Sequence, residues 1–372
     1  MYRLFVTFVY LIVLSIKFSP FVYSDDSVLV LQNCLDNLER LNVIEYEETA
    51  SVKENWTKTP PGGLLSKEVI SHVRRDGDSI DVEHQEKIFL NGKFDHLQAR
   101  RDIVLADSAI WQIKDHTVSQ NFNEKNVYTG AIVTEANRRR LLIPVLCNEN
   151  SGFVLDGYFD EFRFPKLMLD SGHIQNFGEE LIGNYPCVHL QAKTLKGDIS
   201  VWIDQKNGHV IRKAISTKNK ENAKDFTSDF PGWISYVDVI EDIDYKCIDG
   251  VYIPVTGKRT TTQKRESGID SVTTALYARK NILLSPVFKG TNAFVSDFPK
   301  GERVGNIDDK DSGVVYLWNG KKATAGYTAL EGTAYFKGTG NVVRILLMLS
   351  GVVMMSVWAF FKIRQIVNKA LK

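Results

Sequence analysis

The sequence lacks the short motifs that mark the common enzyme classes. It contains no GxSxG, HExxH or P-loop motif, and no GxGxxG after a strand-like run. Its seven histidines are dispersed, and His84-Gln85-Glu86 is not followed by the P-C-x-x-C of zinc deaminases. The sequence therefore predicts a protein that is not an enzyme and has no metal or cofactor, although scattered catalytic carboxylates would escape such a search.

Cysteine is scarce, and neither sign of charge dominates. The four cysteines, Cys34, Cys147, Cys187 and Cys247, are far apart and include no CxxC pair. In an oxidising compartment they allow two disulfides in three possible pairings, and structural thiols are the alternative. The 46 Lys and Arg residues nearly balance the 45 Asp and Glu residues. This balance disfavours nucleic acid and strongly charged substrates as partners.

An apolar run near the N-terminus has the layout of a secretory signal. Arg3 precedes the run from Leu4 to Ile16, and small residues follow as Val22-x-Ser24. This pattern predicts a signal peptide over residues 1–24. An uncleaved anchor is the alternative, but the run is short for a membrane span and is broken by Lys17 and the proline that follows it.

A second apolar run, near the C-terminus, predicts a transmembrane helix over residues 342–361. No charge interrupts Ile345 to Phe361, and Arg344 can extend its side chain to the interface. At about 1.5 Å per residue such a helix spans a hydrocarbon core of about 30 Å. The basic tail of residues 362–372 is then cytoplasmic by the positive-inside rule. We therefore expect a single-pass protein whose N-terminal ectodomain is periplasmic or extracellular.

The ectodomain begins with helical spacing and continues with strand-like alternation. Apolar residues three or four apart predict an amphipathic helix from Ser27 to Leu41. A second helix is expected over residues 135–147. Alternating segments separated by Gly-containing turns predict strands; the clearest are 43–56, 79–90, 187–192, 198–204, 209–215, 233–245, 251–262 and 271–278.

This order of elements predicts an α+β fold in which a strongly curved antiparallel sheet, a half-barrel, packs on the N-terminal and central helices. We place this domain at residues 25–284. Residues 285–341 have a different composition and are expected to form a small β appendage and a juxtamembrane spacer. The concave face of such a sheet would leave an apolar cleft under the helices.

The segment GDISVWID, residues 197–204, shows which side chains would line that cleft. Ile199, Val201 and Ile203 share one face of the expected strand. Trp202 lies on the opposite face, where a solvated sheet would normally carry a charged residue. The sequence gives no reason for this exception.

Two blocks of sequence resemble the LolA/LolB-like superfamily of outer-membrane lipoprotein carriers. They are Gly183 to Lys213 and Asp244 to Pro254, and the resemblance covers about residues 27–287. It implies a half-barrel that holds lipid or the acyl chain of a lipoprotein. The C-terminal anchor and the segment Pro299 to Lys321 are unlike the soluble carriers and are similar to anchored members from Planctomycetes-like bacteria.

Two functions are therefore open. The first is a membrane-anchored protein that binds a lipid or a lipoprotein acyl chain in the concave face of the sheet. The side chains expected to line its site are Trp56, Phe89, Trp111, Ile113, Val188, Leu190, Val201 and Ile203. The second is an envelope sensor or protein-interaction scaffold that has a membrane or envelope protein as its partner and no bound lipid.

Overall fold

A computed structural model describes most of the expected ectodomain. The described residues are 25–58, 64–105, 108–116, 127–134, 146, 152–159, 162–223, 232–289, 291–294, 303–306, 314–317 and 334–336. The expected signal peptide, transmembrane helix and basic tail lie outside these residues, as does all but Leu146 of the helix expected over residues 135–147. In the described part of the chain, neither helix is long and apolar enough to cross a bilayer.

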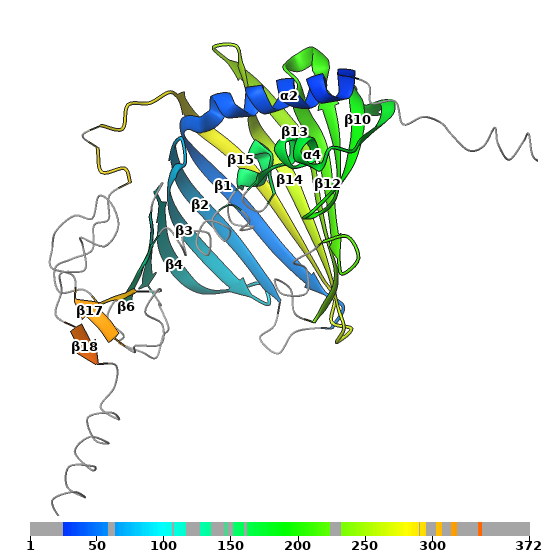
Figure 1. The fold of residues 1–372 in the computed structure, drawn as a ribbon. Helices are drawn as coiled ribbons and strands as arrows, with labels where there is room; N and C mark the ends of the chain where they lie inside the picture. The colour runs from blue at the N-terminus through cyan, green and yellow to red at the C-terminus, as the bar shows by residue number, and fades with distance from the viewer. Residues whose placement is uncertain are drawn as a thin grey trace, which may run out of the picture.

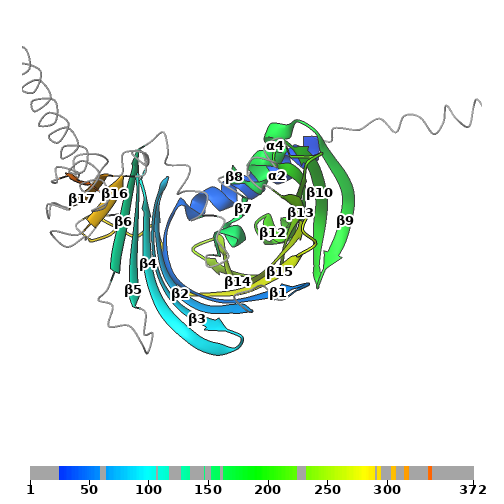
Figure 2. The same ribbon diagram turned by 90° about the horizontal axis from the view of Figure 1, so that it is seen from below.

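One large curved sheet dominates the fold and does not close into a barrel (Figures 1 and 2). Its order is β18-β17-β16-β6-β5-β4-β3-β2-β1-β15-β14-β13-β12-β11-β10-β9. The strands are β1 (Val43–Trp56), β2 (Leu65–Asp76), β3 (Ser79–Leu90), β4 (Lys93–Val104), β5 (Ser108–His116), β6 (Val127–Thr134), β9 (Ile174–Ile182), β10 (Tyr185–Thr194), β11 (Gly197–Asp204), β12 (Val210–Asn219), β13 (Trp233–Ile248), β14 (Val251–Arg265), β15 (Ser271–Leu284), β16 (Arg303–Asn306), β17 (Val314–Leu317) and β18 (Ala334–Phe336). The expected curved antiparallel sheet is confirmed.

Two runs of hairpins build this sheet and meet at a seam. β1 to β6 follow one another outward in one direction, and β15 to β9 do so in the other, so that β1 pairs with β15. Tight turns connect neighbours, for example at Gly77 between β2 and β3, where the backbone φ of +58° suits glycine. The strands after β15 join the same sheet, because β16 pairs in parallel with β6.

The helix α2 (Asp25–Glu39) crosses one end of the concave face (Figure 1). It continues as the 3₁₀ turn η1 (Arg40–Asn42), so the helix expected at residues 27–41 is confirmed. Leu31, Cys34 and Leu38 face the sheet and are buried, whereas Leu29 is 57% exposed on the opposite face. This one-sided burial is what the apolar spacing of the sequence required.

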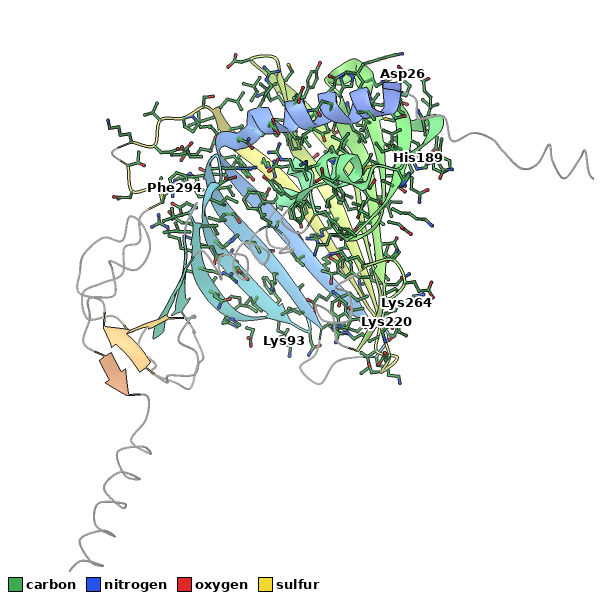
Figure 3. All side chains as sticks on the ribbon, in the orientation of Figure 1. Asp26, Lys93, His189, Lys220, Lys264 and Phe294 are labelled. Carbon is green, nitrogen blue, oxygen red and sulfur yellow. The ribbon has the colours of Figure 1, made fainter. Side chains whose placement is uncertain are left out.

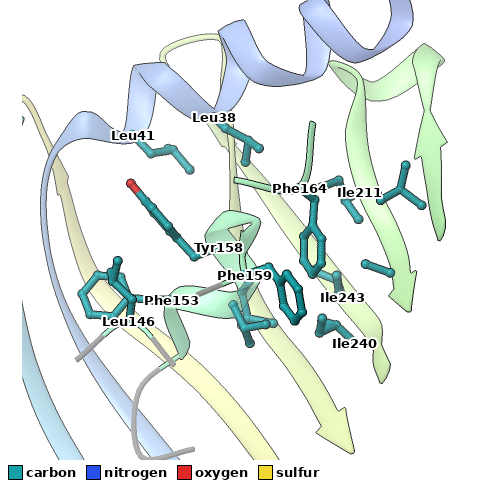
Figure 4. Close-up of a cluster of buried hydrophobic side chains, with 14 of the residues drawn as sticks. Leu38, Leu41, Leu146, Phe153, Tyr158, Phe159, Phe164, Ile211, Ile240 and Ile243 are labelled. Atoms are coloured by element: carbon teal, nitrogen blue, oxygen red, sulfur yellow. The ribbon is translucent and has the colours of Figure 1, made fainter. Parts of the chain in front are cut away.

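A compact segment fills the space between α2 and the sheet. We call it the plug: η2 (Gly152–Asp156), β7 (Tyr158–Phe159), β8 (Phe162–Arg163) and α4 (Phe164–Ser171). Figure 4 shows Phe159 and Phe164 beside the sheet residues Ile211, Ile240 and Ile243, and Phe153 beside Leu146. Gly257 on β14 leaves room for Leu155, because an added Cβ would lie 2.4 Å from the Leu155 Cδ2 atom. The plug is therefore closely fitted to the sheet.

A buried ion network connects the plug to the seam. Arg279 on β15 donates to Glu48 on β1 at 2.9 Å and to Asp156 of the plug at 2.6 Å. Its second terminal nitrogen donates to the Gly152 carbonyl oxygen at 2.6 Å, and the Gly152 amide donates to Glu48 at 2.6 Å. The Glu48 and Arg279 side chains are fully buried. Burial raises the pKa of the Glu48 carboxyl, and the Arg279 guanidinium opposes that shift.

After β15 the chain crosses the outer, convex face of the sheet. We call residues 285–289 and 291–294 the strap. The Phe294 amide donates to Asp81 of β3 at 2.9 Å, and Arg101 of β4 donates to the Asn292 carbonyl oxygen at 2.9 Å. Figure 3 shows Phe294 beside this part of the sheet. The strap carries the chain from the central strand β15 toward the distant strand β6.

The three described cysteines do not pair with one another. Cys34 and Cys187 are buried free thiols, and Cys247 is an exposed free thiol. Burial raises the pKa of the Cys34 thiol to about 12. Cys34 and Cys187 therefore behave as structural core residues, while Cys147 lies outside the described residues.

Removal of Arg279 tests the seam network. Arg279→Leu leaves two buried carboxylates without their cation, and we expect the free energy of unfolding to fall by about 3–5 kcal/mol. Lys280→Leu is the matched control, because its ammonium pairs with Glu47 on the exposed face. Urea midpoints of the full chain, followed by limited proteolysis, measure both. Equal midpoints for the two variants would show that the network does not hold the plug.

Candidate functional site

The side chains expected to line a ligand cleft fall into separate environments. Leu190, Val201 and Ile203 are fully buried in the hydrophobic cluster that includes α2 and the plug. The sequence assigned them correctly to the concave face, but the protein's own residues already cover them. A ligand could reach them only by displacing the plug.

The remaining expected side chains do not converge on one place. Trp56 lies at the end of β1 remote from α2, with the Arg265 guanidinium 5.1 Å from its ring centroid. Phe89 contacts Phe94 edge-to-face on the outer face of the β3–β4 hairpin, with ring centroids 6.0 Å apart. Trp111 and Ile113 belong to β5, whose side chains lie outside the described part of the structure. Their ligand-binding role stays a prediction.

Val188 borders a small groove at the start of α2. The groove has a volume of about 290 Å³. Its other lining residues are Asp26, Leu29, Val30, Asn33, Asn176, Gln205 and His209. Most of these are polar, so this groove does not match the apolar site expected for Val188.

The concave wall beyond the plug carries paired charges. Arg259 of β14 makes a bidentate contact with Asp238 of β13, with Nη2 to Oδ2 at 2.7 Å, and Thr261 donates to Asp238 at 2.6 Å. On the opposite part of the wall, Lys67 lies 3.9 Å from Glu86. Buried charges of this kind require partners, and both pairs have them. Apart from the Arg279 network, the described wall is thus mainly apolar where the plug covers it, and it carries paired charges beyond the plug.

One buried polar group contains the residue types of a hydrolase triad. The Ser71 hydroxyl lies 2.8 Å from His84 Nδ1, and His84 Nε2 lies 3.8 Å from Asp102. The second distance is too long for a hydrogen bond, and Arg100 holds the Asp102 carboxylate from the other side at 2.8 Å. Ser71 is only 1% exposed. This geometry does not resemble a working nucleophile and base.

Burial strongly shifts the pKa values of His84 and Asp102 in this group. Burial, with help from Arg100 and Lys67, lowers the pKa of His84 to about 3. Burial also raises the pKa of Asp102 to about 6, although Arg100 opposes that shift. His84 is therefore a neutral hydrogen-bonding residue at physiological pH, with little capacity to accept a proton.

A groove larger than the one beside Val188 lies on the outer face of the sheet. It has a volume of about 510 Å³ and crosses β15, β1, β2, β3 and β4. Two adjacent rows of side chains form it, as the strand register shows: Ala278, Thr49, Ile70 and Gln85 in one row, and Leu276, Ser51, Glu68, Lys87 and Leu97 in the other. Their buried neighbours Ala50, Val69 and Tyr277 complete the lining.

Exposed apolar side chains distinguish this outer groove from the rest of the convex face. Leu276 is 53% exposed, Ile70 is 51% exposed and Leu97 is 38% exposed. By contrast, neighbouring β14 presents Lys258, Thr260 and other threonines outward. Figure 2 shows the β3–β4 hairpin curving away beside β2 and β1 in the same sheet. A strand alternation in the sequence cannot reveal this curvature.

A row of ion pairs borders the outer groove on the side toward the strap. It runs across five strands as Lys280, Glu47, His72, Glu83 and Arg101. Arg74, in the next row, contacts Glu83 at 2.8 Å and Asp81 at 3.2 Å. Arg101 in turn contacts Asp81 at 2.8 Å. The cations of this border are thus engaged with carboxylates of the protein.

Trp202 has a structural role on the outer face of the sheet, near the edge formed by β9. Its ring stacks on His189 at 4.1 Å, and His189 stacks on Phe177 of β9 at 4.8 Å. Trp202 Nε1 and His189 Nδ1 both bond to Glu180 at 2.8 Å. These contacts join the last strand, β9, to β10 and β11. They explain why a tryptophan replaces a charge at this outward position.

One family model matches the central part of the chain. Residues 164–243, from α4 into β13, match a family described as "Predicted periplasmic protein (DUF2092)". No curated protein matches the sequence.

Solved structures resemble the chain only distantly. A DUF1329 family protein from Desulfovibrio piger has a TM-score of 0.38 at 9% identity, covering 72% of this chain and 95% of that one. A structure entitled "Lipid-protein interactions in lipovitellin" has a TM-score of 0.30 at 9% identity, covering 66% of this chain and 26% of that one. MucB in complex with MucA(peri) has a TM-score of 0.18 at 9% identity, covering 69% and 98%. Likenesses of this size carry no functional argument.

The pH dependence of stability tests the burial of His84. The folded pKa of about 3 lies below the ordinary value of 6.5, so the stability that neutral His84 contributes is complete above pH 6.5 and is lost as the pH falls toward 3. Between pH 7.5 and pH 5, we expect wild type to lose about 2 kcal/mol of unfolding free energy relative to His84→Asn.

Urea midpoints of the full chain at the two pH values measure this difference. Asp102 is present in both proteins, so its opposite pH dependence cancels to first order. His173→Asn is the control, because its exposed ring meets water in both states; its profile should follow the wild type. If the difference in unfolding free energy between wild type and His84→Asn were the same at both pH values, His84 would be accessible to protons in the folded protein.

Proposed function

We propose that this chain is an extracytoplasmic, non-enzymatic protein that binds an apolar ligand, a lipid or the acyl chain of a lipoprotein, in the outer groove. The proposal retains a signal peptide at residues 1–24, a membrane anchor at residues 342–361 and a LolA/LolB-like ancestry for the half-barrel. The family description of residues 164–243 supports the compartment.

The observation that carries the proposal is the exposed apolar lining of the outer groove. A volume of about 510 Å³ falls within the range of about 300–1,000 Å³ that is usual for small-molecule sites. Ile70, Leu97 and Leu276 leave apolar surface in contact with water there. Covering this surface with an aliphatic chain stabilises a complex by about 25 cal/mol for each Å² removed from water.

The outer groove fits this role better than the concave face does. The apolar part of the concave wall is occupied by Phe153, Phe159 and Phe164 of the plug. Beyond the plug, Arg259 and Asp238 would have to lose water or partners to admit an acyl chain. The outer groove requires neither displacement nor desolvation of a buried charge.

A second function, as a protein-interaction scaffold, is favoured by the edge strand β9. It ends the described sheet, and Phe177 and Leu181 on it are 47% and 72% exposed. Edge strands with exposed apolar residues pair readily with an extended segment of another protein. Glu179 and Glu180 would favour a basic segment.

Photo-crosslinking tests the scaffold function. A photoreactive amino acid at Leu181 should capture a specific protein in intact cells. The same amino acid at Leu195, which is 76% exposed in the β10–β11 turn, should not capture it. Equal capture from both positions would argue against an interaction at β9.

Labelling with an uncharged alkyl diazirine tests the apolar ligand site. Light should attach the probe to peptides of β2, β4 and β15 in the full chain. Ile70→Asn should reduce this labelling roughly fivefold, since about 1 kcal/mol of apolar contact is lost. Mass spectrometry of the labelled peptides, and of lipid that co-purifies with the chain, provides both readouts.

Leu195→Asn is the matched control for the groove, since it removes an exposed leucine elsewhere. Both substitutions are on the surface and should change stability by less than about 0.5 kcal/mol. Labelling that is confined to other strands, or that is unaffected by Ile70→Asn, would remove the outer groove as the ligand site.

A further inference from the structure

The outer groove contains two charged side chains, one of each sign, among its described lining residues. Glu68 of β2 and Lys87 of β3 are directly opposite each other in the strand register. They stand in the same row as Leu276, Ser51 and Leu97, so the charges are adjacent to the apolar surface. The next outward cation along β1, Lys53, lies outside the lining.

Glu68 and Lys87 form a loose pair. The Lys87 ammonium is 4.0 Å from the Glu68 carboxylate, and their side chains are 56% and 62% exposed for Lys87 and Glu68 respectively. An exposed pair at this distance contributes little to stability. Each side chain can therefore leave its partner and pair with a charge of the ligand, and the protein loses little stability.

The neighbouring ions differ in this respect. Arg74 and Arg101 at the border share Asp81 and Glu83, with Asp81 fully buried. Releasing either arginine for a ligand would remove one of the two cations that neutralise buried Asp81, which is expensive. These two arginines thus offer no favourable site for an anionic headgroup, and the exchangeable charges among the groove's described lining residues sum to zero.

We propose that the ligand of the outer groove is an amphiphile with a zwitterionic headgroup. The anion of the headgroup meets Lys87, its cation meets Glu68, and its aliphatic chain lies on Ile70, Leu97 and Leu276. This inference rests on the function proposed above for the same groove. The shared chemistry is one anion and one cation on a short head, as in phosphate with ammonium or carboxylate with ammonium.

Competition against the alkyl diazirine label tests this specificity on the full chain. The competitors share an octyl chain and differ in the head: phosphocholine, betaine, phosphate, trimethylammonium and glucoside, all below their micellar concentrations. We expect the phosphocholine or the betaine to compete at about fivefold lower concentration than the other three, the size of effect expected for exposed charge pairs. The better of the two identifies phosphate or carboxylate as the anion.

Single substitutions assign the two charges separately. Lys87→Gln should lose the preference for zwitterions and favour the trimethylammonium head about threefold. Glu68→Gln should instead favour the phosphate head by a similar factor. Competition by the glucoside should be the same in both variants, because its head is uncharged, and this readout shows that the groove is intact.

Glu47→Gln and Lys280→Gln are the matched controls. They remove an exposed pair, 3.1 Å apart, from the bordering row on the same face, and they should leave the order of competitors unchanged. Octyl phosphate competing as well as the zwitterions, or an unchanged order in Lys87→Gln, would overturn the headgroup assignment and leave the proposed function standing. Failure of the diazirine to label the groove at all would overturn both.

Discussion

The buried guanidinium of Arg279 is the contact on which the architecture depends. It lies where the two runs of hairpins meet, and it binds carboxylates from β1 and from the plug at the same time. A cation in this position is stable only while both partners are present. The seam and the plug therefore support each other, and the curved sheet packs around the plug.

Because the plug covers the concave face, the accessible apolar surface of the described sheet lies on its convex face. The concave face, which the hairpin pattern offers as a ligand site, is occupied by Phe153, Phe159 and Phe164. On the convex face, which normally carries mainly polar residues, the outer groove exposes Ile70 and Leu276. An accessible apolar surface is thus found outside the half-barrel.

Periodicity in the sequence predicted the main elements, whereas the ligand-binding role of the side chains it singled out stays a prediction. Helical spacing located α2, and alternation assigned Ile199, Val201 and Ile203 to the concave face, because both patterns are local. The plug was missed because FPKLMLDS is short and its burial depends on partners such as Leu38 and Ile211 that are distant in sequence. The outer groove was missed because its residues come from five strands, and only the register brings Ile70 beside Thr49 and Gln85.

The pairing of β1 with β15 has a consequence for the order of events at biosynthesis. Glu48 and Arg279 are 231 residues apart in the chain, so the first strand emerges long before its neighbour exists. Until then one side of β1 presents unpaired backbone groups, and contacts of such large sequence separation form slowly. Until β15 has been synthesised, this edge of β1 is open to pairing with strands of other molecules, so association between chains competes with folding.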